Sequence, residues 1–446
     1  FKLKNVLETY PRDELFQITE NTLLETALGI LALEKRPRTA VFIREDKFKR
    51  FCSCLVYISR EKYNTDLRHS IETILTAELN GSISAFYVQL DDNPLARCQI
   101  IVKMLGSVIP NYSRKKIETK LTEVTQSWSD NLKNTLKTKH GGDKAFEIEK
   151  RWVNRFEPGY KDLYNSSEVV EDIFYLEKTL ETGQISLNLY RNIDSHFSTV
   201  RFKIYTTKGV IPLSDVVPIF EDLGFRVIDE MGPHFINLQG INKESGTIHN
   251  FGLEYKKSLP INLKNVRENF HQTFYEVWHQ NVESDGLNAL TIGANLSWRN
   301  IIIIRAYSKY LRQIGTKFSQ AYMELTLSSN SSITKDIVSL FLTRFDPKKN
   351  SLREKQCSNL QNRIRISIES VVNADQDQIL RSFWNLIEST TRTNYFQKSA
   401  SGQNKSYLSF KFNCASIENL PLPKPFREIF IYSRKVEGLH LRFGYI

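Results

Sequence analysis

The chain has 446 residues, more than a single hydrophobic core supports, and this length predicts two to four domains. Hydrophobic residues make up 41% and charged residues 25%, which is typical of an ordinary soluble globular protein. No window contains the ~18 consecutive apolar residues that a membrane-spanning helix needs, and we expect no membrane partner. Five cysteines, an odd number on a long chain, disfavour a disulfide scaffold and predict a cytoplasmic location.

The chain carries a net charge of +11 and has an isoelectric point near 9.2. A basic balance permits binding to nucleic acid or to an anionic surface. The lysines and arginines are dispersed among acidic residues, however, and the few short basic clusters are best explained as solvated surface.

Residues 1–40 predict an N-terminal helical segment, which Arg36-Pro37-Arg38 ends. Residues 41–140 predict the order strand, helix, strand, strand, helix. The predicted strands are 50–58, 82–90 and 96–104, and the predicted helices are 67–79 and 117–136. Cys52 and Cys54 share one face of the first strand, and we expect them to be small buried side chains rather than metal ligands.

Residues 141–195 predict a polar helical connector with a strand at 184–190. Residues 196–284 then repeat the earlier order of strands and helices. The predicted strands are 200–206, 225–229, 235–241 and 247–255, and the predicted helices are 213–223 and 265–281. One helix layer on an antiparallel sheet is the ferredoxin-like arrangement, so the pattern predicts two ferredoxin-like units.

Residues 285–400 predict an all-helical segment, although Ile364, Ile366 and Ile368 fit a strand as well as a helix. Residues 401–446 begin with a polar loop and continue as short β-rich runs behind a proline-punctuated lead-in. These runs are typical of the first strands of a further domain, and Phe1 is not an initiator methionine. We therefore expect the chain to be a piece of a longer protein.

A set of ordered motifs carries a family resemblance. The sequence LPLPKPFREIFIYS at 420–433, followed by VEGLHLRFG at 436–444, resembles the entry to the catalytic domain of the large bacterial NAD-dependent glutamate dehydrogenases. Further stretches resemble the N-terminal region of the same family, at 10–16, 44–57, 201–218, 285–290, 307–313 and 392–397.

The resemblance implies an α+β fold with two ACT-type domains at 41–140 and 196–284 and a helical domain at 285–400. Residues 401–446 would begin a truncated catalytic domain. The implied reaction of the parent enzyme converts L-glutamate, NAD and water into 2-oxoglutarate, NADH and ammonium. The resemblance also implies a homo-oligomer and, because ACT domains commonly bind free amino acids, an amino-acid effector.

No catalytic motif accompanies this resemblance. The sequence has no G-x-G-x-x-G turn, no phosphate-loop lysine motif and no HExxH-type metal motif. The segments that carry catalysis in the family cannot be placed on this chain, so we expect no catalytic, NAD-binding or metal-binding residue in it. We expect structural roles for the five histidines that could suggest a site, which are His196, His234, His249, His271 and His279.

The best candidate ligand site is the turn after the strand at 200–206, with Thr207, Gly209 and, on the helix that follows, Asp215. In ACT-type modules this turn often lines the effector pocket, because free backbone N–H groups there can receive a carboxylate. The alternative is a tight connection in which Gly209 only supplies a permissive φ angle. The equivalent turn of the first unit is 59–64.

Two functions stay open at this point. The first is a regulatory and oligomerising region of an NAD-dependent glutamate dehydrogenase that lacks the catalytic residues. The second is an RNA-binding protein that uses basic ferredoxin-like domains. The RNP-type aromatic pattern is absent and the strand that carries Phe202 is predicted to be buried, so nucleic acid is the less favoured partner.

Overall fold

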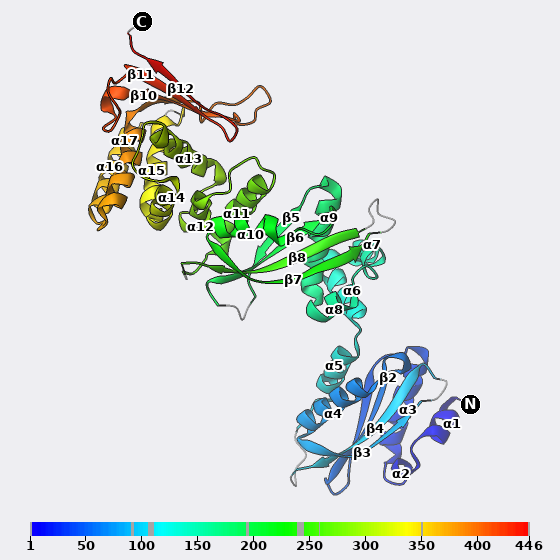
Figure 1. The fold of residues 1–446 in the computed structure, drawn as a ribbon. Helices are drawn as coiled ribbons and strands as arrows, with labels where there is room; N and C mark the ends of the chain where they lie inside the picture. The colour runs from blue at the N-terminus through cyan, green and yellow to red at the C-terminus, as the bar shows by residue number, and fades with distance from the viewer. Residues whose placement is uncertain are drawn as a thin grey trace. The chain divides into compact units, whose positions relative to one another are not determined.

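The computed structural model describes residues 2–90, 93–105, 111–192, 196–238, 245–257, 259–348 and 351–444. The chain divides into two compact units. The first comprises Phe1–Val153 with Tyr164–Val170, and the second comprises Asn154–Leu163 with Glu171–Ile446. The first unit contains one four-stranded sheet and the second contains two, and the paired strands of all three are antiparallel (Figure 1).

The first unit is built around a sheet with the order β1-β2-β4-β3. Its elements are α1 (Lys2–Thr9), α2 (Arg12–Leu15), α3 (Glu20–Lys35), β1 (Ala40–Glu45), β2 (Phe51–Ser59), η1 (Arg60–Lys62), α4 (Thr65–Leu79), β3 (Gly81–Gln89), β4 (Leu95–Met104), α5 (Arg114–Thr125), α6 (Trp128–His140) and α7 (Gly142–Trp152). The Asn64 side chain accepts a hydrogen bond from the Leu67 N–H and begins α4, and Asn80, in the left-handed conformation, ends it. The helix ends at Leu79, as predicted, and begins two residues before the predicted start at residue 67.

Helices cover both faces of this first sheet. Ile71 of α4 and Leu121 of α5 pack with Cys54 of β2 on one face. Ile30 of α3 packs with Tyr57 of β2 on the other face. The central strand β2 is therefore buried along nearly its whole length, whereas the sequence predicted one buried face. The five cysteines are free, and burial raises the pKa of the Cys52 thiol to about 11.

Two predictions for this unit are wrong in detail. The sheet has a fourth strand, β1, which the sequence pattern did not predict. The predicted helix 117–136 is two helices, because the first helix ends at Gln126 and Ser127 caps the start of the second. Ser127 and Asp130 form a reciprocal capping box, which stabilises a new helix start at this position.

The second unit begins with a sheet of the same topology, in the order β5-β6-β8-β7. The elements of this part are α8 (Pro158–Leu163), α9 (Ser166–Thr182, which starts in the first unit), β5 (Ser186–Tyr190), β6 (Thr199–Thr206), α10 (Leu213–Asp222), β7 (Phe225–Asn237), β8 (Ser245–Tyr255) and α11 (Leu263–Trp278). The two short strands predicted at 225–229 and 235–241 form one bulged strand, and residues 239–241 lie outside the described residues.

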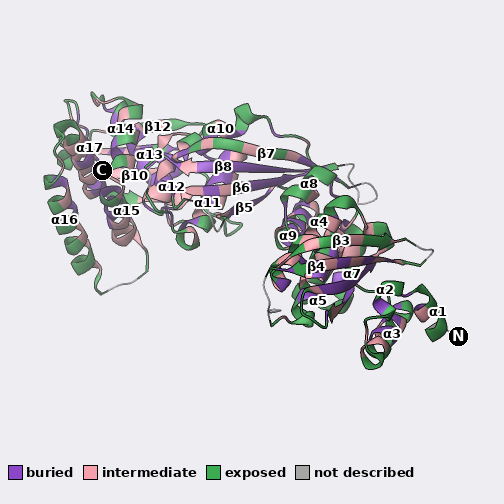
Figure 2. Ribbon diagram, turned by 90° about the horizontal axis from the view of Figure 1, so that it is seen from below, coloured by how far each residue is buried: buried purple, intermediate pink, exposed green. Residues whose placement is uncertain are grey.

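Helices α10 and α11 pack on one face of this second sheet. Phe202 of β6 is fully buried and contacts Phe220 of α10 and Phe270 of α11, with ring centroids 5.4 and 5.2 Å apart. Because strand side chains alternate, Lys203 and Tyr205 point to the opposite face, where both hydrogen-bond to Asp172 of α9. Both faces of β6 are therefore covered, and Figure 2 shows the buried colour along β6 and β8.

The remainder of the second unit contains helices and a third sheet, in the order β12-β11-β10-β9. Its elements are η2 (Gly286–Ala289), α12 (Leu290–Gly293), α13 (Trp298–Gln313), α14 (Gln320–Ser329), α15 (Ser331–Phe345), α16 (Arg353–Glu369), α17 (Ala374–Ser389), β9 (Thr390–Thr393), β10 (Leu408–Asn413), η3 (Cys414–Ser416), β11 (Arg427–Tyr432) and β12 (Glu437–Arg442). The ambiguous run at Ile364 is helical: Ile364 and Ile368 are buried, and Ile366 between them is exposed.

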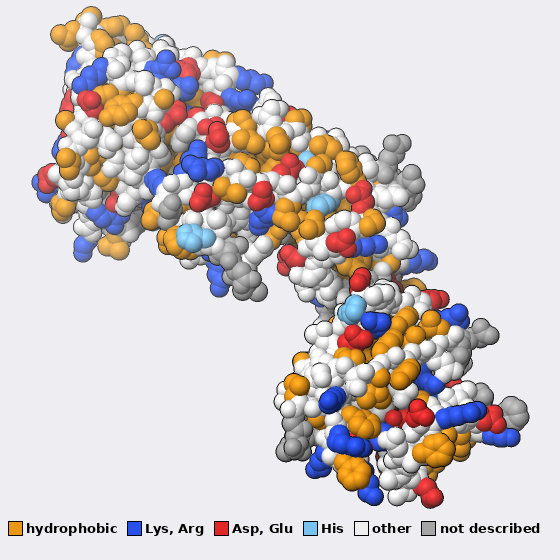
Figure 3. All heavy atoms as spheres, turned by 60° about the horizontal axis from the view of Figure 1, so that its bottom comes forward, with side chains coloured by type: hydrophobic (Ala, Val, Ile, Leu, Met, Phe, Trp, Pro, Cys, Tyr) orange, Lys and Arg blue, Asp and Glu red, His pale blue; other side chains and the backbone are white. Residues whose placement is uncertain are grey.

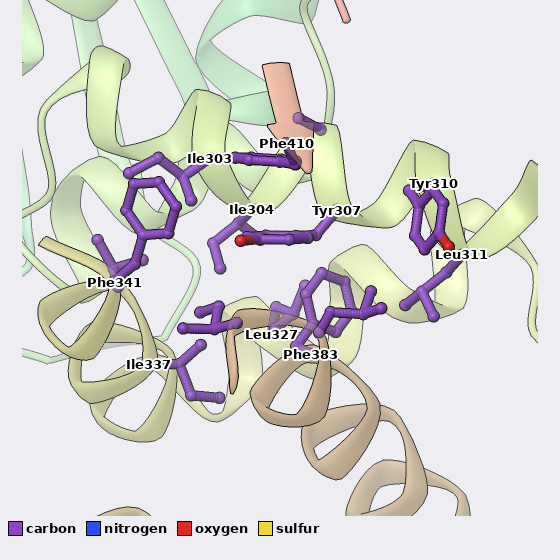
Figure 4. Close-up of a cluster of buried hydrophobic side chains, with 14 of the residues drawn as sticks. Ile303, Ile304, Tyr307, Tyr310, Leu311, Leu327, Ile337, Phe341, Phe383 and Phe410 are labelled. Carbon is purple, nitrogen blue, oxygen red and sulfur yellow. The ribbon is translucent and has the colours of Figure 1, made fainter. Parts of the chain in front are cut away.

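These helices and the third sheet share one hydrophobic core. Tyr307 of α13 stacks on Phe410 of β10 with ring centroids 4.2 Å apart, and Phe341 of α15 meets the same phenylalanine edge-on (Figure 4). The predicted boundary at residue 400 falls inside this core. The domain boundaries proposed from the sequence stay predictions.

Candidate functional site

The turn between β6 and α10 forms a small hollow of about 150 Å³. Its lining residues are Gln184, Ile185, Thr206, Lys208, Gly209, Val210, Ile211, Pro212, Asp215, Trp278 and His279. Gly209 has a φ of +91°, a conformation that side chains other than glycine rarely adopt. Two of the three predicted residues, Gly209 and Asp215, line the hollow, whereas Thr207 does not and its neighbour Thr206 does.

Hydrogen bonds fix both ends of this turn. The Thr206 hydroxyl accepts from the Lys208 N–H at 3.1 Å, and Nε2 of the buried His249 accepts from the Ile211 N–H at 3.1 Å. Among the described residues, the N–H groups of Gly209 and Val210 have no hydrogen-bond partner. The turn therefore presents free amide donors beside the start of α10, an arrangement suited to a carboxylate.

An acceptor lies on the same side of the turn. Asp215 is exposed in the first turn of α10 and accepts a hydrogen bond from the Ser214 hydroxyl at 3.0 Å. The hollow thus combines amide donors with a carboxylate. A free α-amino acid carries the complementary pair of groups, a carboxylate and an ammonium.

Three lining residues come from distant parts of the sequence. Gln184 precedes β5, and Trp278 and His279 lie at the end of α11. His279 contacts the Gln184 side chain at 3.0 Å and the Tyr275 carbonyl at 2.8 Å. No local spacing in the sequence connects these residues to the turn, so the sequence alone did not assign them to this site.

Comparison with known proteins places the two sheets in named domains. Family models match residues 40–129 as glutamate dehydrogenase ACT2 domain and 184–266 as its ACT3 domain. Models of helical motif 1 and helical motif 3 of glutamate dehydrogenase match residues 2–36 and 282–347. A model of the bacterial NAD-glutamate dehydrogenase catalytic domain matches residues 363–446.

Three similar proteins are named NAD-specific glutamate dehydrogenase. NAD-specific glutamate dehydrogenases of Halomonas elongata, Pseudomonas aeruginosa and Mycobacterium tuberculosis are 38%, 33% and 29% identical over 99% of this chain. The chain belongs to this family. It spans only 27% of the length of the Halomonas and Pseudomonas relatives, and 28% of the Mycobacterium one.

Both ACT domains have a fourth strand that precedes the predicted strand–helix–strand–strand unit; in ACT3 it is the strand predicted at 184–190 as part of the connector, and in ACT2 it was not predicted. In each, the edge strand beside the first central strand comes from the residues before that strand, β1 in ACT2 and β5 in ACT3. The turn after the central strand differs between them. In ACT2 it contains the 3-10 helix η1 and leads to the Asn64 cap, and in ACT3 it contains Gly209 and the hollow.

The histidines of ACT3 hold backbone and side-chain contacts. His249 is fully buried and its Nδ1 lies 2.6 Å from Glu230 Oε1. Burial and the Lys203 charge lower the pKa of His234, whereas His196 lies apart and contacts the Ser198 hydroxyl. Among the described residues, no group of three His, Cys, Asp or Glu side chains could hold a metal ion.

His271 of α11 is expected to make ACT3 sensitive to acid. Its Nε2 accepts from the Leu189 N–H at 3.0 Å, and burial lowers the pKa of the ring from 6.5 to about 4. Between these pH values the unfolded chain binds a proton that the folded chain does not, so stability falls as pH decreases through this window. The expected loss is about 2–3 kcal/mol.

Chemical denaturation at pH 7 and pH 4.5 checks this expectation. His271→Gln keeps an acceptor near the Leu189 N–H and removes the titration, so its stability should fall less between the two pH values. Parallel losses in the variant and the parent chain would show that another group controls the acid response.

The family implies NAD, but the described residues do not form a dinucleotide-binding fold. That fold needs parallel strands joined by a helix, with a glycine-rich turn at the first strand end. Every strand pair of the described residues is antiparallel, and the fingerprint is absent from the sequence. No described helix is long and apolar enough to cross a membrane.

Proposed function

We propose that this chain is a regulatory and oligomerising region of an NAD-dependent glutamate dehydrogenase that resides in the cytoplasm. The parent enzyme would convert L-glutamate, NAD and water into 2-oxoglutarate, NADH and ammonium. In this proposal the ACT and helical domains assemble the subunits of a homo-oligomer and sense a free amino acid. Catalysis and NAD binding would belong to other parts of the enzyme.

The observation that carries the proposal is the pairing of donors and an acceptor at the ACT3 turn. The N–H groups of Gly209 and Val210 would receive the ligand carboxylate, and Asp215 would receive its ammonium. His279 and Trp278 would contact the amino-acid side chain from the opposite wall.

A route from this hollow to the helical domain supports a regulatory role. The Ser284 hydroxyl donates to Asp222 at the end of α10 at 2.6 Å, and Lys257 Nζ donates to the Ser328 carbonyl of α14 at 2.5 Å. These contacts join ACT3 to α14 and to the segment before η2. A ligand that shifts α10 would therefore move groups bonded to the helical domain.

Amino-acid binding by the purified chain tests the effector site. Isothermal titration with each of the common L-amino acids should find at least one that binds, and Asp215→Asn should weaken it about tenfold or more, since a charge-assisted hydrogen bond contributes about 1.5–3 kcal/mol. Asp375→Asn is the matched control, because Asp375 is an exposed aspartate in the first turn of α17, outside the hollow. Absence of binding by every amino acid, or equal weakening in the control, would remove the effector from the proposal.

The burial of two central strands counts against the RNA-binding alternative. RNA-binding ferredoxin-like sheets stack bases on aromatic side chains exposed on their central strands. In this chain β2 and β6, one central strand of each ACT sheet, are covered on both faces, and Phe202 has no exposed surface. On the face that Figure 3 shows, basic and acidic side chains are interspersed rather than gathered by sign.

A further inference from the structure

A second and larger hollow, of about 440 Å³, lies in the second unit and shares no lining residue with the hollow of the ACT3 turn. The end of α11, the start of α13, the segment before β10 and the turn between β11 and β12 surround it. Its lining residues are Glu276, Gln280, Asn281, Glu283, Trp298, Arg299, Ile302, Tyr395, Asn404, Lys405, Ser406, Tyr407, Leu408, Tyr432, Ser433, Arg434 and Lys435. Pockets of this volume hold small metabolites.

Four cationic side chains line this hollow. Arg299 is half-buried, donates to the Tyr395 carbonyl at 2.6 Å and lies over the Tyr395 ring at 4.6 Å. Lys405, Arg434 and Lys435 form no ion pair with any described residue. The guanidinium and ammonium groups therefore retain donors for a ligand.

The two carboxylates of the lining are already bonded. Glu276 accepts from the Asn281 amide at 2.9 Å. Glu283 accepts from the Tyr432 hydroxyl and lies 3.9 Å from the buried Arg305. Four cations against two engaged carboxylates leave the hollow positive, and like charges held together repel unless an anion binds between them.

The type of cation and the aromatic walls narrow the ligand class. A guanidinium presents a planar fork that matches phosphate oxygens, and several cations together suit a ligand with more than one negative charge. Trp298 and Tyr407 add ring surfaces to the lining. We propose that this hollow binds a small metabolite that carries a diphosphate group. This hollow shares no lining residue with the ACT3 hollow, although Arg434 and Asp215 both line a third hollow. The proposal does not rest on the effector role of the ACT3 turn.

Isothermal titration of the purified chain with ADP, inorganic pyrophosphate and adenosine tests the proposal. At low ionic strength ADP or pyrophosphate should bind, adenosine should not, and added salt should weaken the binding because it screens exposed charges. Tighter binding of ADP than of pyrophosphate would assign a role to the ring surfaces, and equal binding would assign recognition to the diphosphate alone. No binding of either diphosphate, or equal binding of adenosine, would overturn the proposal.

A pair of variants locates the site. Arg434→Ala with Lys435→Ala should weaken binding about tenfold or more, and both residues lie exposed in a turn, so the fold should persist. Arg312→Ala with Lys335→Ala removes the same two residue types from exposed positions outside the hollow and should leave affinity unchanged. An unchanged thermal unfolding midpoint in both double variants shows that the fold is intact. Equal weakening in both would mean that net charge and not this hollow attracts the anion, which contradicts the proposal.

Discussion

Asp172→Ala is expected to lower the free energy of unfolding of the second unit by about 3–5 kcal/mol, because it leaves a buried ammonium without its anion. Asp172 and Lys203 are 1% and 2% exposed, and Lys203 Nζ lies 2.7 Å from Asp172 Oδ2. The hydroxyls of Tyr205 and Tyr160 donate to the same carboxylate, so its removal also deprives two buried donors of an acceptor. Urea denaturation followed by circular dichroism measures the change.

Two further variants separate this buried pair from an ordinary surface pair. Asp229→Ala removes the partner of Arg201 on the same strand β6, but Asp229 is 51% exposed, so we expect a loss of at most about 1 kcal/mol. Asp172→Leu combined with Lys203→Met should recover part of the lost stability, because it removes both buried charges but still leaves the hydroxyls of Tyr160 and Tyr205 without their acceptor. Equal losses for Asp172→Ala and Asp229→Ala would contradict the role given to burial.

Arg305→Met is expected to cost a similar 3–5 kcal/mol in the part of the same unit that contains α13. The Arg305 guanidinium is fully buried. Nε and Nη2 donate to the two carboxylate oxygens of Asp285 at 2.6 and 2.9 Å, and Nη2 also donates to Asn288 Oδ1 at 2.8 Å. This single side chain of α13 bonds to the segment 285–290. Its loss leaves the Asp285 carboxylate without its principal cation.

The matched control for Arg305 is Arg363. Arg363 also donates two hydrogen bonds to one carboxylate, that of Asp336, but the arginine side chain is 61% exposed. Arg363→Met should therefore cost at most about 1 kcal/mol. Arg305→Lys should fall between the two, because an ammonium cannot span both Asp285 oxygens and Asn288 at once. A thermal unfolding midpoint of Arg305→Met close to that of Arg363→Met would contradict the claim that burial makes the loss of Arg305 more costly.

Local patterns in the sequence predicted the helices and strands that depend on residues close together in the chain. The strand predicted at 247–255 is β8, and the helix predicted at 67–79 is α4. The order of strands and helices was enough to identify two antiparallel units of one type.

The sequence could not show what depends on contacts between distant residues. Strand β1 is a short apolar run without alternation, which a helix would fit equally well. The second buried face of β2 depends on α3, and the second buried face of β6 depends on Asp172 of α9, and neither helix marks its partner strand. The apolar spacing continues across Gln126 and therefore predicted one helix, although the capping box at Ser127 divides α5 from α6.

The residues of the candidate site at the ACT3 turn show the same difference between local and distant contacts. Gly209 and Asp215 belong to one turn and one helix start, so local reasoning found them. Gln184 and His279 reach the same hollow only because β5 lies beside β6 and α11 packs across the sheet. A single sequence contains no pattern that predicts this contact between distant residues.

Glutamate-dependent formation of NADH by the purified chain tests the central claim most directly, because the proposal places regulation in this chain and catalysis elsewhere in the enzyme. With saturating L-glutamate and NAD we predict no NADH above a reaction without protein, even when the amino acid that binds the ACT3 turn is present. Sustained turnover by this chain, abolished by omitting glutamate, would contradict that assignment.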